Sequence, residues 1–264
     1  MLGEREILMQ LEEFFVRYPK CALAFSGGTD SAYLLYAAMQ YGCNIRAYYV
    51  RSVFQPEFEY QDAMKIVEQL QADMRIIHCS VLEDEKVRMN PANRCYYCKQ
   101  RIFSAISRQA QADGYSVILD GTNASDDAAD RPGMKALAEL KVLSPLRMCG
   151  ISKSDVRRLS KEAGLFTYQK ASYACLATRI AAGHEIRTED LQCVEQAEAA
   201  LSDMGFHNFR LRLYRYEEGV AALETEEGQW QYARDHLVEI QERLRPWFHC
   251  VVLEESYRAT EEIP

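Results

Sequence analysis

The stretch AFSGGTDSAYLL, residues 24–35, places two glycines, two serines and an aspartate between an apolar strand and an apolar helix. Gly27 and Gly28 allow a sharp turn and a close approach of the backbone to a ligand. The free N–H groups and the positive end of the following helix favour an anion at this position. The stretch therefore predicts a phosphate site, and its alternative is a helix cap that binds no ligand.

The polar side chains of this stretch fit the same prediction. Ser26 and Ser31 carry hydroxyl groups that can donate to phosphate oxygens. Asp30 has the same sign of charge as a phosphate, and a bound Mg²⁺ would explain its presence. The spacing is neither G-x-G-x-x-G nor G-x-x-x-x-G-K-[ST], because no lysine follows the second glycine. The order Ser-Gly-Gly-x-Asp-Ser is similar to the PP-loop of ATP pyrophosphatases, which cleave ATP between its α- and β-phosphates and activate an oxygen as the adenylate.

Strand and helix patterns alternate through the first part of the chain, which predicts an α/β fold with a parallel sheet flanked by helices. The predicted strands are 21–25, 45–50, 74–81, 115–121 and a short fifth at 141–146. Ser152 and Asp155 form a predicted capping box, and Gly164 ends that helix. A smaller α+β unit follows, with predicted helices at 188–204 and 226–243. We place the boundary at residue 180, which gives domains 1–180 and 181–264.

The composition of the chain argues against a nucleic-acid-binding, secreted or membrane protein. The chain has 264 residues, 48% of them hydrophobic, and a net charge of −8, which argues against a broad electrostatic grip on nucleic acid. The sequence shows no signal peptide, and no apolar run approaches the roughly 20 residues that a membrane helix needs. We expect a cytoplasmic protein with no membrane partner, in which the nine cysteines are reduced.

Three cysteines stand out by their spacing or position. Cys95 and Cys98 are three residues apart, so on a helix they share one face and can chelate one metal or one cluster edge. A lone C-x-x-C can also be redox-active, hold zinc or occur by chance. Cys175 lies in a loop-like junction, and three thiolates without a fourth suit a cluster with one open iron. Packing or chance explains the remaining six, which are Cys21, Cys43, Cys79, Cys149, Cys193 and Cys250.

Together with the PP-loop, three further stretches give the chain its resemblance to a known family. They are DGTNASDD (120–127), LSPL (143–146) and CLATRI (175–180), and with them the chain resembles the LarE family. The resemblance implies an ATP-dependent sulfurtransferase that takes part in nickel-pincer nucleotide biosynthesis for lactate racemase. Such an enzyme adenylates a carboxylate of pyridinium-3,5-dicarboxylic acid mononucleotide and replaces oxygen with sulfur to give a thiocarboxylate.

The resemblance also implies cofactors and partners. One branch of the family sacrifices a single cysteine, and the other holds a 4Fe–4S cluster with three cysteines. Cys175 matches the shared cysteine, and Cys95 and Cys98 match the additional pair, so the chain resembles the cluster branch. ATP, Mg²⁺ and the cluster are the implied cofactors. The implied partners are an upstream carboxylase, a downstream nickel-inserting enzyme and further copies of the chain in a homo-oligomer.

Other polar residues are candidates for contact with ATP or substrate. Arg210 and Arg212 fall on one face of a predicted strand, where they can clamp a phosphate or form a solvated edge, and Glu224 can pair with them. The end of strand 115–121, the segment after it and three cations can face ATP, its metal or a phosphate. These residues are Gly121, Thr122, Asn123, Asp126, Arg179 and, less specifically, Lys153 and Arg131. Asp127 and Asp130 fit solvated loop charges.

Three other functions fit parts of the pattern. A tRNA thiolase with the same loop and cluster would need a basic surface or an added RNA-binding module. A binding protein that has lost catalysis would not need the intact Ser26, Asp30 and Ser31. An amidating PP-loop synthetase would need a source of ammonia, and the sequence has no glutaminase domain.

Overall fold

The computed structural model describes residues 4–126 and 132–255, with the backbone alone for residues 4–10. Asp127, Asp130 and Arg131 lie outside the described residues. Contacts divide the described chain into two compact units, one of residues 4–81 and 93–172 and the other of residues 82–92 and 173–255. The boundary at residue 180 stays a prediction, and each unit is described by itself below.

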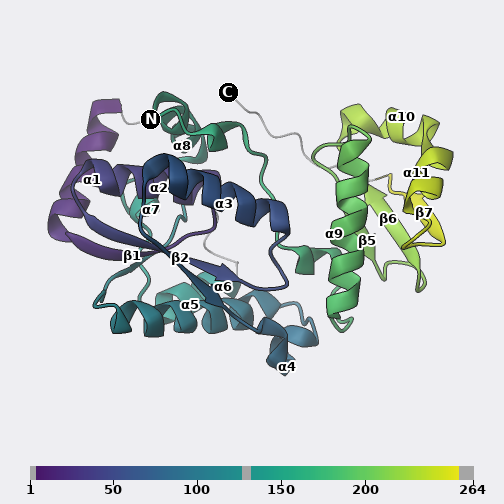
Figure 1. Cartoon of the computed structure of the whole chain (residues 1–264), viewed down its shortest axis with the longest axis horizontal. Helices are drawn as coiled ribbons and strands as arrows, with labels where there is room; N and C mark the ends of the chain where they lie inside the picture. Colours follow the sequence, from purple (N-terminus) through teal and green to yellow (C-terminus); the bar gives the residue numbers. More distant parts are fainter. Residues whose placement is uncertain (1–3, 127–131, 256–264) are drawn as a thin grey trace. The chain divides into compact units, whose positions relative to one another are not determined.

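The first unit is built on a four-stranded parallel sheet in the order β3-β2-β1-β4 (Figure 1). Its strands are β1 (Lys20–Ala24), β2 (Asn44–Arg51), β3 (Met74–His78) and β4 (Ile118–Leu119). The predicted α/β fold is thereby confirmed. The fifth predicted strand is reduced to one parallel bridge between Leu119 and Leu143. Pro145 ends it, because proline has no N–H for a ladder and is well suited to start the short helix α7 (Pro145–Met148).

Helices cover both faces of this sheet (Figure 1). One face packs on α1 (Glu4–Arg17), α2 (Thr29–Gln40), α3 (Glu57–Leu70) and α8 (Lys153–Glu162). The other packs on α5 (Arg94–Ala112) and α6 (Pro132–Glu139). Successive residues of β1 point to opposite cores, with Leu23 in the first and Ala22 in the second. Burial on both faces explains why β1 is continuously apolar from Cys21 to Ala24 rather than alternating.

The capping box at the start of α8 is confirmed. The Ser152 hydroxyl accepts a hydrogen bond from the Asp155 N–H, and the Asp155 carboxylate accepts one from the Ser152 N–H. Burial raises the pKa of Asp155, but the hydrogen bonds from Ser152 and the charge of Arg158 outweigh it, so the net pKa is below the ordinary range of an aspartate. The box fixes where α8 begins and therefore where its first residue, Lys153, lies.

The second unit contains a three-stranded sheet in the order β5-β6-β7. β5 (Arg210–Leu213) runs antiparallel to β6 (Val220–Glu224), which is parallel to β7 (Cys250–Leu253). α9 (Thr188–Asp203) packs against β5, while η3 (Leu176–Arg179) contacts both elements. α4 (Glu85–Arg88) also belongs to this unit, after the short turn η1 (Val81–Glu83).

The prediction of one helix over 226–243 is wrong. The structure has α10 (Glu227–Asp235) and α11 (Leu237–Leu244), separated at His236. His236 has φ −106 and ψ 16, outside the helical well, and it serves as the last cap of one helix and the first cap of the next. Among the described helices, none has both the length and the apolar character that crossing a bilayer requires.

Candidate functional site

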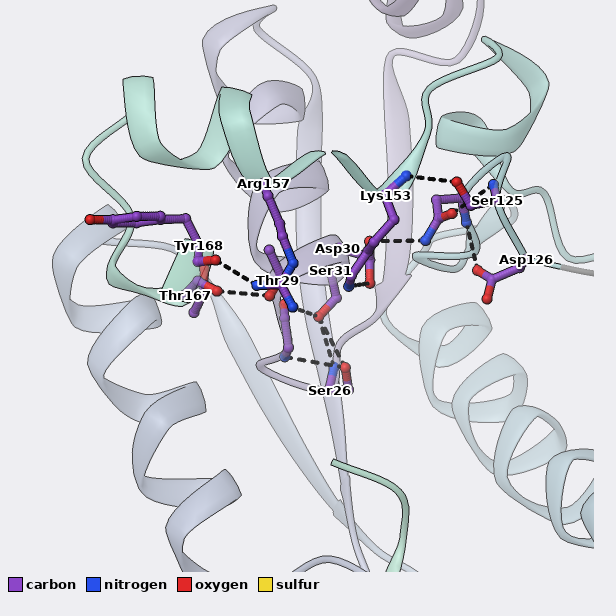
Figure 2. Close-up of polar contacts among 12 residues, drawn as sticks. Ser26, Thr29, Asp30, Ser31, Ser125, Asp126, Lys153, Arg157, Thr167 and Tyr168 are labelled. Carbon is purple, nitrogen blue, oxygen red and sulfur yellow. Dashed lines mark hydrogen bonds and ion pairs between the residues drawn. The ribbon is translucent and has the colours of Figure 1, made fainter. Parts of the chain in front are cut away.

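The loop from Ser26 to Gly28 connects β1 to α2 in the first unit (Figure 2). Gly27 has φ +73, a conformation that residues with a side chain rarely adopt. A Cβ added at Gly27 would lie 2.7 Å from the Cβ of Ala63 in α3. The loop backbone therefore packs directly against α3, and the glycine predicted from the sequence is required by both conformation and space.

Two hydroxyl groups lie together at this loop. The Oγ atoms of Ser26 and Ser31 are 3.1 Å apart, and the N–H of Gly28 donates to Ser26 Oγ at 3.3 Å (Figure 2). Ser31 is buried, and its hydroxyl donates to the carbonyl of Gly28 at 3.2 Å. Both serines thus face the first turn of α2, where the N–H groups of a helix have no intrahelical acceptor. This arrangement brings together donors of the kind that bind phosphate oxygens.

Asp30, in the first turn of α2, is held by two residues from distant parts of the chain. Its Oδ2 accepts from the Nζ of Lys153 at 2.6 Å, and its Oδ1 accepts from the Nδ2 of Asn123 at 3.1 Å (Figure 2). The side chains of Asp30 and Lys153 are 24% and 30% exposed, so solvent or a ligand still reaches the pair. Lys153, which the sequence offers only as one of several loop cations, is therefore part of this site.

The segment after β4 lies against the same helix end. A Cβ at Gly121 would be 3.0 Å from the backbone nitrogen of Ser31, so this glycine permits close backbone packing. Thr122 donates its hydroxyl to Asp120 at 2.5 Å, and Asp126 accepts from the N–H of Asn123 at 3.1 Å. Of the four residues predicted here, Asn123 reaches Asp30 directly, whereas the hydroxyl of Thr122 anchors its own loop.

Several residues that hold this segment are not among those predicted from the sequence. Buried Asp120 also accepts from the hydroxyl of Ser144 at 2.6 Å. The hydroxyl of Ser125 accepts from the N–H of Lys153 at 3.0 Å, and the N–H of Ala124 donates to the carbonyl of Ile151 at 2.8 Å. DGTN and LSPL were the available signals, because both hold serine, threonine or aspartate directly after a strand pattern.

A second set of contacts fixes the opposite side of α2. Buried Thr29 donates its hydroxyl to the carbonyl of Thr167 at 2.7 Å, across 138 positions of sequence. Arg157 of α8 donates to the carbonyl of Tyr168 at 2.6 Å (Figure 2). Both acceptors belong to η2 (Phe166–Gln169), a turn in what the sequence presents as a loop. No local pattern signals either contact.

Arg179 in the second unit is fully buried. Its Nε and Nη2 donate to the two carboxylate oxygens of Glu198 at 2.8 and 3.0 Å, and its Nη1 donates to the carbonyl of Ala174 at 2.8 Å. Glu198 accepts as well from the hydroxyl of Tyr173 at 2.7 Å. This network fixes the loop around Cys175, and the predicted phosphate contact of Arg179 would require part of it to open.

The two arginines of β5 share one face of the strand, as their alternation predicts. Leu211 and Leu213 are buried on the other face. Arg212 pairs with Glu224 of β6, with Nη2 2.9 Å from Oε2, and it also donates to the carbonyl of Thr178. Arg210 is half-buried. Glu224 therefore pairs with one of the two arginines, as expected, while their contact with a phosphate stays a prediction.

The three cysteines singled out by sequence lie in different units. Cys95 is exposed and Cys98 is half-buried at the start of α5, and the Nη2 of Arg94 is 3.7 Å from Cys95 Sγ. Cys175 is half-buried in the second unit, where it caps η3. In the described ranges, no three side chains of His, Cys, Asp or Glu gather closely enough to hold a metal ion. The thiols have the donor chemistry and, for the pair, the helical spacing of cluster ligands, and the three-cysteine set stays a prediction.

Comparison with known proteins identifies the family. The model of the family described as "Thiamine biosynthesis protein (ThiI)" matches residues 19–202, which include the loop, α2, Asn123 and Lys153. The chain belongs to this ThiI-like family of PP-loop ATP pyrophosphatases. As a member of this family, it is an ATP-using enzyme, and the predicted PP-loop at the start of α2 lies within the matched residues.

Three relatives match most of the chain. An uncharacterized protein of Synechocystis sp. is 32% identical over 225 residues, 85% of this chain and 83% of its own. The pyridinium-3,5-bisthiocarboxylic acid mononucleotide synthase of Lactiplantibacillus plantarum is 29% identical over 211 residues, 79% of this chain and 75% of its own. An uncharacterized protein of Methanocaldococcus jannaschii is 29% identical over 208 residues, 79% of this chain and 78% of its own.

Proposed function

We propose that the protein is an ATP-dependent sulfurtransferase acting on pyridinium-3,5-dicarboxylic acid mononucleotide. It adenylates a carboxylate of this substrate and converts it to a thiocarboxylate, in biosynthesis of the nickel-pincer cofactor of lactate racemase. The observation that carries the proposal is the PP-loop with Asp30 and Lys153 paired at 2.6 Å, in a chain 29% identical over 211 residues to a synthase of that bisthiocarboxylic acid mononucleotide.

In this proposal the first unit binds and orients ATP. The N–H groups of Gly27 and Gly28 and the hydroxyls of Ser26 and Ser31 bind the phosphates. The carboxylate of Asp30 has the hard oxygen donors that Mg²⁺ prefers, and its exposure leaves room for that ion. The ammonium of Lys153 stabilises the negative charge that develops as pyrophosphate leaves. These residues thereby make AMP the leaving group of an activated carboxylate.

Adenylation is needed because a carboxylate is a poor electrophile and its oxygen is a poor leaving group. Cys95, Cys98 and Cys175 would hold a 4Fe–4S cluster, which when bound supplies sulfur without consuming a protein cysteine. Arg94 donates from Nη2 to Cys95 Sγ at 3.7 Å, which helps to fix the position of one proposed ligand. Arg210 and Arg212 are the proposed clamp for the phosphate of the mononucleotide.

The partners of this reaction follow from the same proposal. A carboxylase must supply the dicarboxylated substrate, and a nickel-inserting enzyme must consume the dithiolated product. Self-association into a homo-oligomer is also proposed. RNA is not a proposed partner, since a net charge of −8 gives no broad attraction for a polyanion.

The decisive experiment measures iron and acid-labile sulfide in protein purified without oxygen, together with AMP formed on addition of the mononucleotide substrate. About four irons per chain are expected for a 4Fe–4S cluster. C98A is expected to lose the iron, and C79A is a matched control because Cys79 is a half-buried cysteine of the same unit outside the proposed ligand set. AMP release that does not depend on the substrate would contradict the proposed reaction.

A second candidate is sacrificial sulfur transfer from Cys175. The half-buried position of Cys175 at the start of η3 supports considering it. In that case the protein contains no iron, and mass spectrometry after turnover shows the loss of one H₂S from the peptide that contains Cys175. This result would keep ATP-dependent sulfur transfer and remove the proposed role of Cys95 and Cys98.

A further inference from the structure

Cys21 and Cys43 lie together in the core of the first unit. Both thiols donate to the carbonyl oxygen of Tyr18, at 3.2 Å from Cys21 and 3.4 Å from Cys43. Cys21 is in β1, and Cys43 directly precedes β2, where Lys20 pairs with Asn44. Cys43 is thus diagonally offset by two positions from Cys21 on the neighbouring strand. Both side chains belong to the same hydrophobic cluster, so they lie on the same face of the sheet.

The two thiols differ in acidity. The closeness of the two thiols lowers the pKa of Cys43 from its ordinary value and, together with burial, raises that of Cys21. A thiolate, rather than a thiol, is the nucleophile in disulfide chemistry. Cys43 is therefore the nucleophilic member of the pair, and Cys21 is the member that remains protonated until a partner sulfur is attacked.

Cys43 is also the member closer to solvent. Cys21 is 0% exposed and Cys43 is 8% exposed. The residue before Cys43 is Gly42, and apart from its two chain neighbours no described heavy atom lies within 4 Å of the position its Cβ would take. The turn between α2 and β2 therefore leaves open space beside the residue that precedes Cys43.

We propose that Cys21 and Cys43 form a redox-active dithiol that closes to a disulfide when a low-molecular-weight disulfide is present. The Cys43 thiolate attacks one sulfur of the reagent and releases one small thiolate, which forms a mixed disulfide at Cys43. Cys21 then loses its proton to solvent and attacks Cys43 Sγ, and the second small thiolate leaves. Two protein thiols are oxidised and one small disulfide is reduced to two thiols, so two electrons and two protons are transferred.

The proposed disulfide would connect the two ends of the segment that carries the nucleotide-binding loop. The segment from Cys21 to Cys43 contains the whole PP-loop and the whole of α2. A disulfide between Cys21 and Cys43 would close that segment into a covalent ring. The disulfide would lie at the amino-terminal ends of β1 and β2, whereas the loop lies at the carboxyl end of β1. The oxidation state of this cysteine pair would therefore depend on the redox potential of the surroundings. The pair lies at the two ends of the segment that contains Ser26, Asp30 and Ser31. This modification is independent of the proposed sulfur-transfer reaction.

The test uses the full chain and oxidised glutathione under native conditions, followed by acid quenching, alkylation and tryptic digestion. Trypsin cuts after Lys20 and Arg46, so one peptide contains both Cys21 and Cys43 and no other cysteine. We expect this peptide to lose two hydrogen atoms and to escape alkylation until a reductant is added. Exposed Cys95 and half-buried Cys98 fall on the single peptide 95–99, which reports whether the oxidant acted.

Two controls make the result decisive. C43S removes the nucleophile, and in it Cys21 is expected to remain a free, alkylatable thiol. Wild-type protein unfolded in urea has no fixed neighbours, so its nine cysteines are expected to form mixed pairings instead of this link. If the peptide of the native protein stays fully reduced while peptide 95–99 is oxidised, or if Cys43 stops at the glutathione adduct, the proposal is overturned.

Discussion

The Nζ of Lys153 lies 2.6 Å from Oδ2 of Asp30, although the two residues are 123 positions apart. Asp30 is in the first turn of α2 and Lys153 is the first residue of α8. The starts of two helices, both of which favour negative charge, are thus joined by one ion pair beside the PP-loop. The pair holds a cation where phosphates are expected and a carboxylate where their metal is expected.

K153M is expected to slow substrate-dependent exchange of pyrophosphate into ATP by about 10²–10³-fold, the usual effect of removing one group that stabilises developing charge. K161M is the matched control, since Lys161 is on the same helix and lies over the ring of Tyr168, 5.5 Å from its centroid. Its exchange rate should stay close to that of the wild type. The D30N/K153M double variant should lose less than the product of the single losses, because the two side chains act as one unit. Multiplicative losses would contradict this coupling.

G27A is expected to lower the free energy of unfolding by about 3 kcal/mol, which combines left-handed strain with the clash against Ala63. G42A gives a matched comparison, because Gly42 has φ +72 and no atom within 4 Å of its Cβ position, whereas Gly27 has φ +73 and a neighbour at 2.7 Å. Only the strain of about 1 kcal/mol applies to G42A. Urea unfolding followed by circular dichroism measures both. Equal losses would show that α3 yields to the added methyl group.

E198Q is expected to destabilise the second unit by about 4 kcal/mol, since it leaves the fully buried guanidinium of Arg179 without a counter-charge. The control D203N removes the carboxylate of an exposed pair with Arg243, where N and O are 3.9 Å apart and the side chains are 77% and 55% exposed. Exposed pairs contribute at most about 1 kcal/mol. Thermal unfolding of the two variants should therefore differ clearly, and a stable E198Q would contradict the structural role given to this pair.

Asp155 predicts a defined pH dependence. Its pKa is lower in the folded protein than in the unfolded chain, so its contribution to stability is complete above the unfolded value and is lost as the pH falls through the folded value. D155A is expected to cost about 1 kcal/mol at pH 7, the usual effect of losing a capping interaction. This difference from the wild type should vanish when the pH falls well below about 4, the ordinary pKa of aspartate. Urea unfolding across this range measures it, and a difference that persists at low pH would exclude an electrostatic cause.

Local chemistry determines how much of this structure could be predicted. Four of the five predicted strands of the first unit, the glycines at 27 and 28 and the capping box of Ser152 depend on neighbouring residues, and the structure contains them. The helix break at His236 has no glycine or proline to announce it. Lys153, Thr167 and the pairing of Cys21 with Cys43 depend on which distant segments meet. The periodicity of a sequence does not predict tertiary contacts between distant segments. For that reason the sequence indicates only a packing role for Cys21 and Cys43.

The hydrogen bond from Thr29 to the carbonyl of Thr167 has a consequence for the order of assembly during synthesis. The PP-loop is complete once residue 31 has left the ribosome. The residues that hold α2 are synthesised much later, because Lys153 follows Asp30 by 123 positions and Thr167 follows Thr29 by 138 positions. A nascent chain that ends at residue 150 contains every serine and glycine of the loop and neither of these supports. Such a fragment is expected to bind no ATP in equilibrium dialysis, so the nucleotide site is among the last features of the first unit to mature.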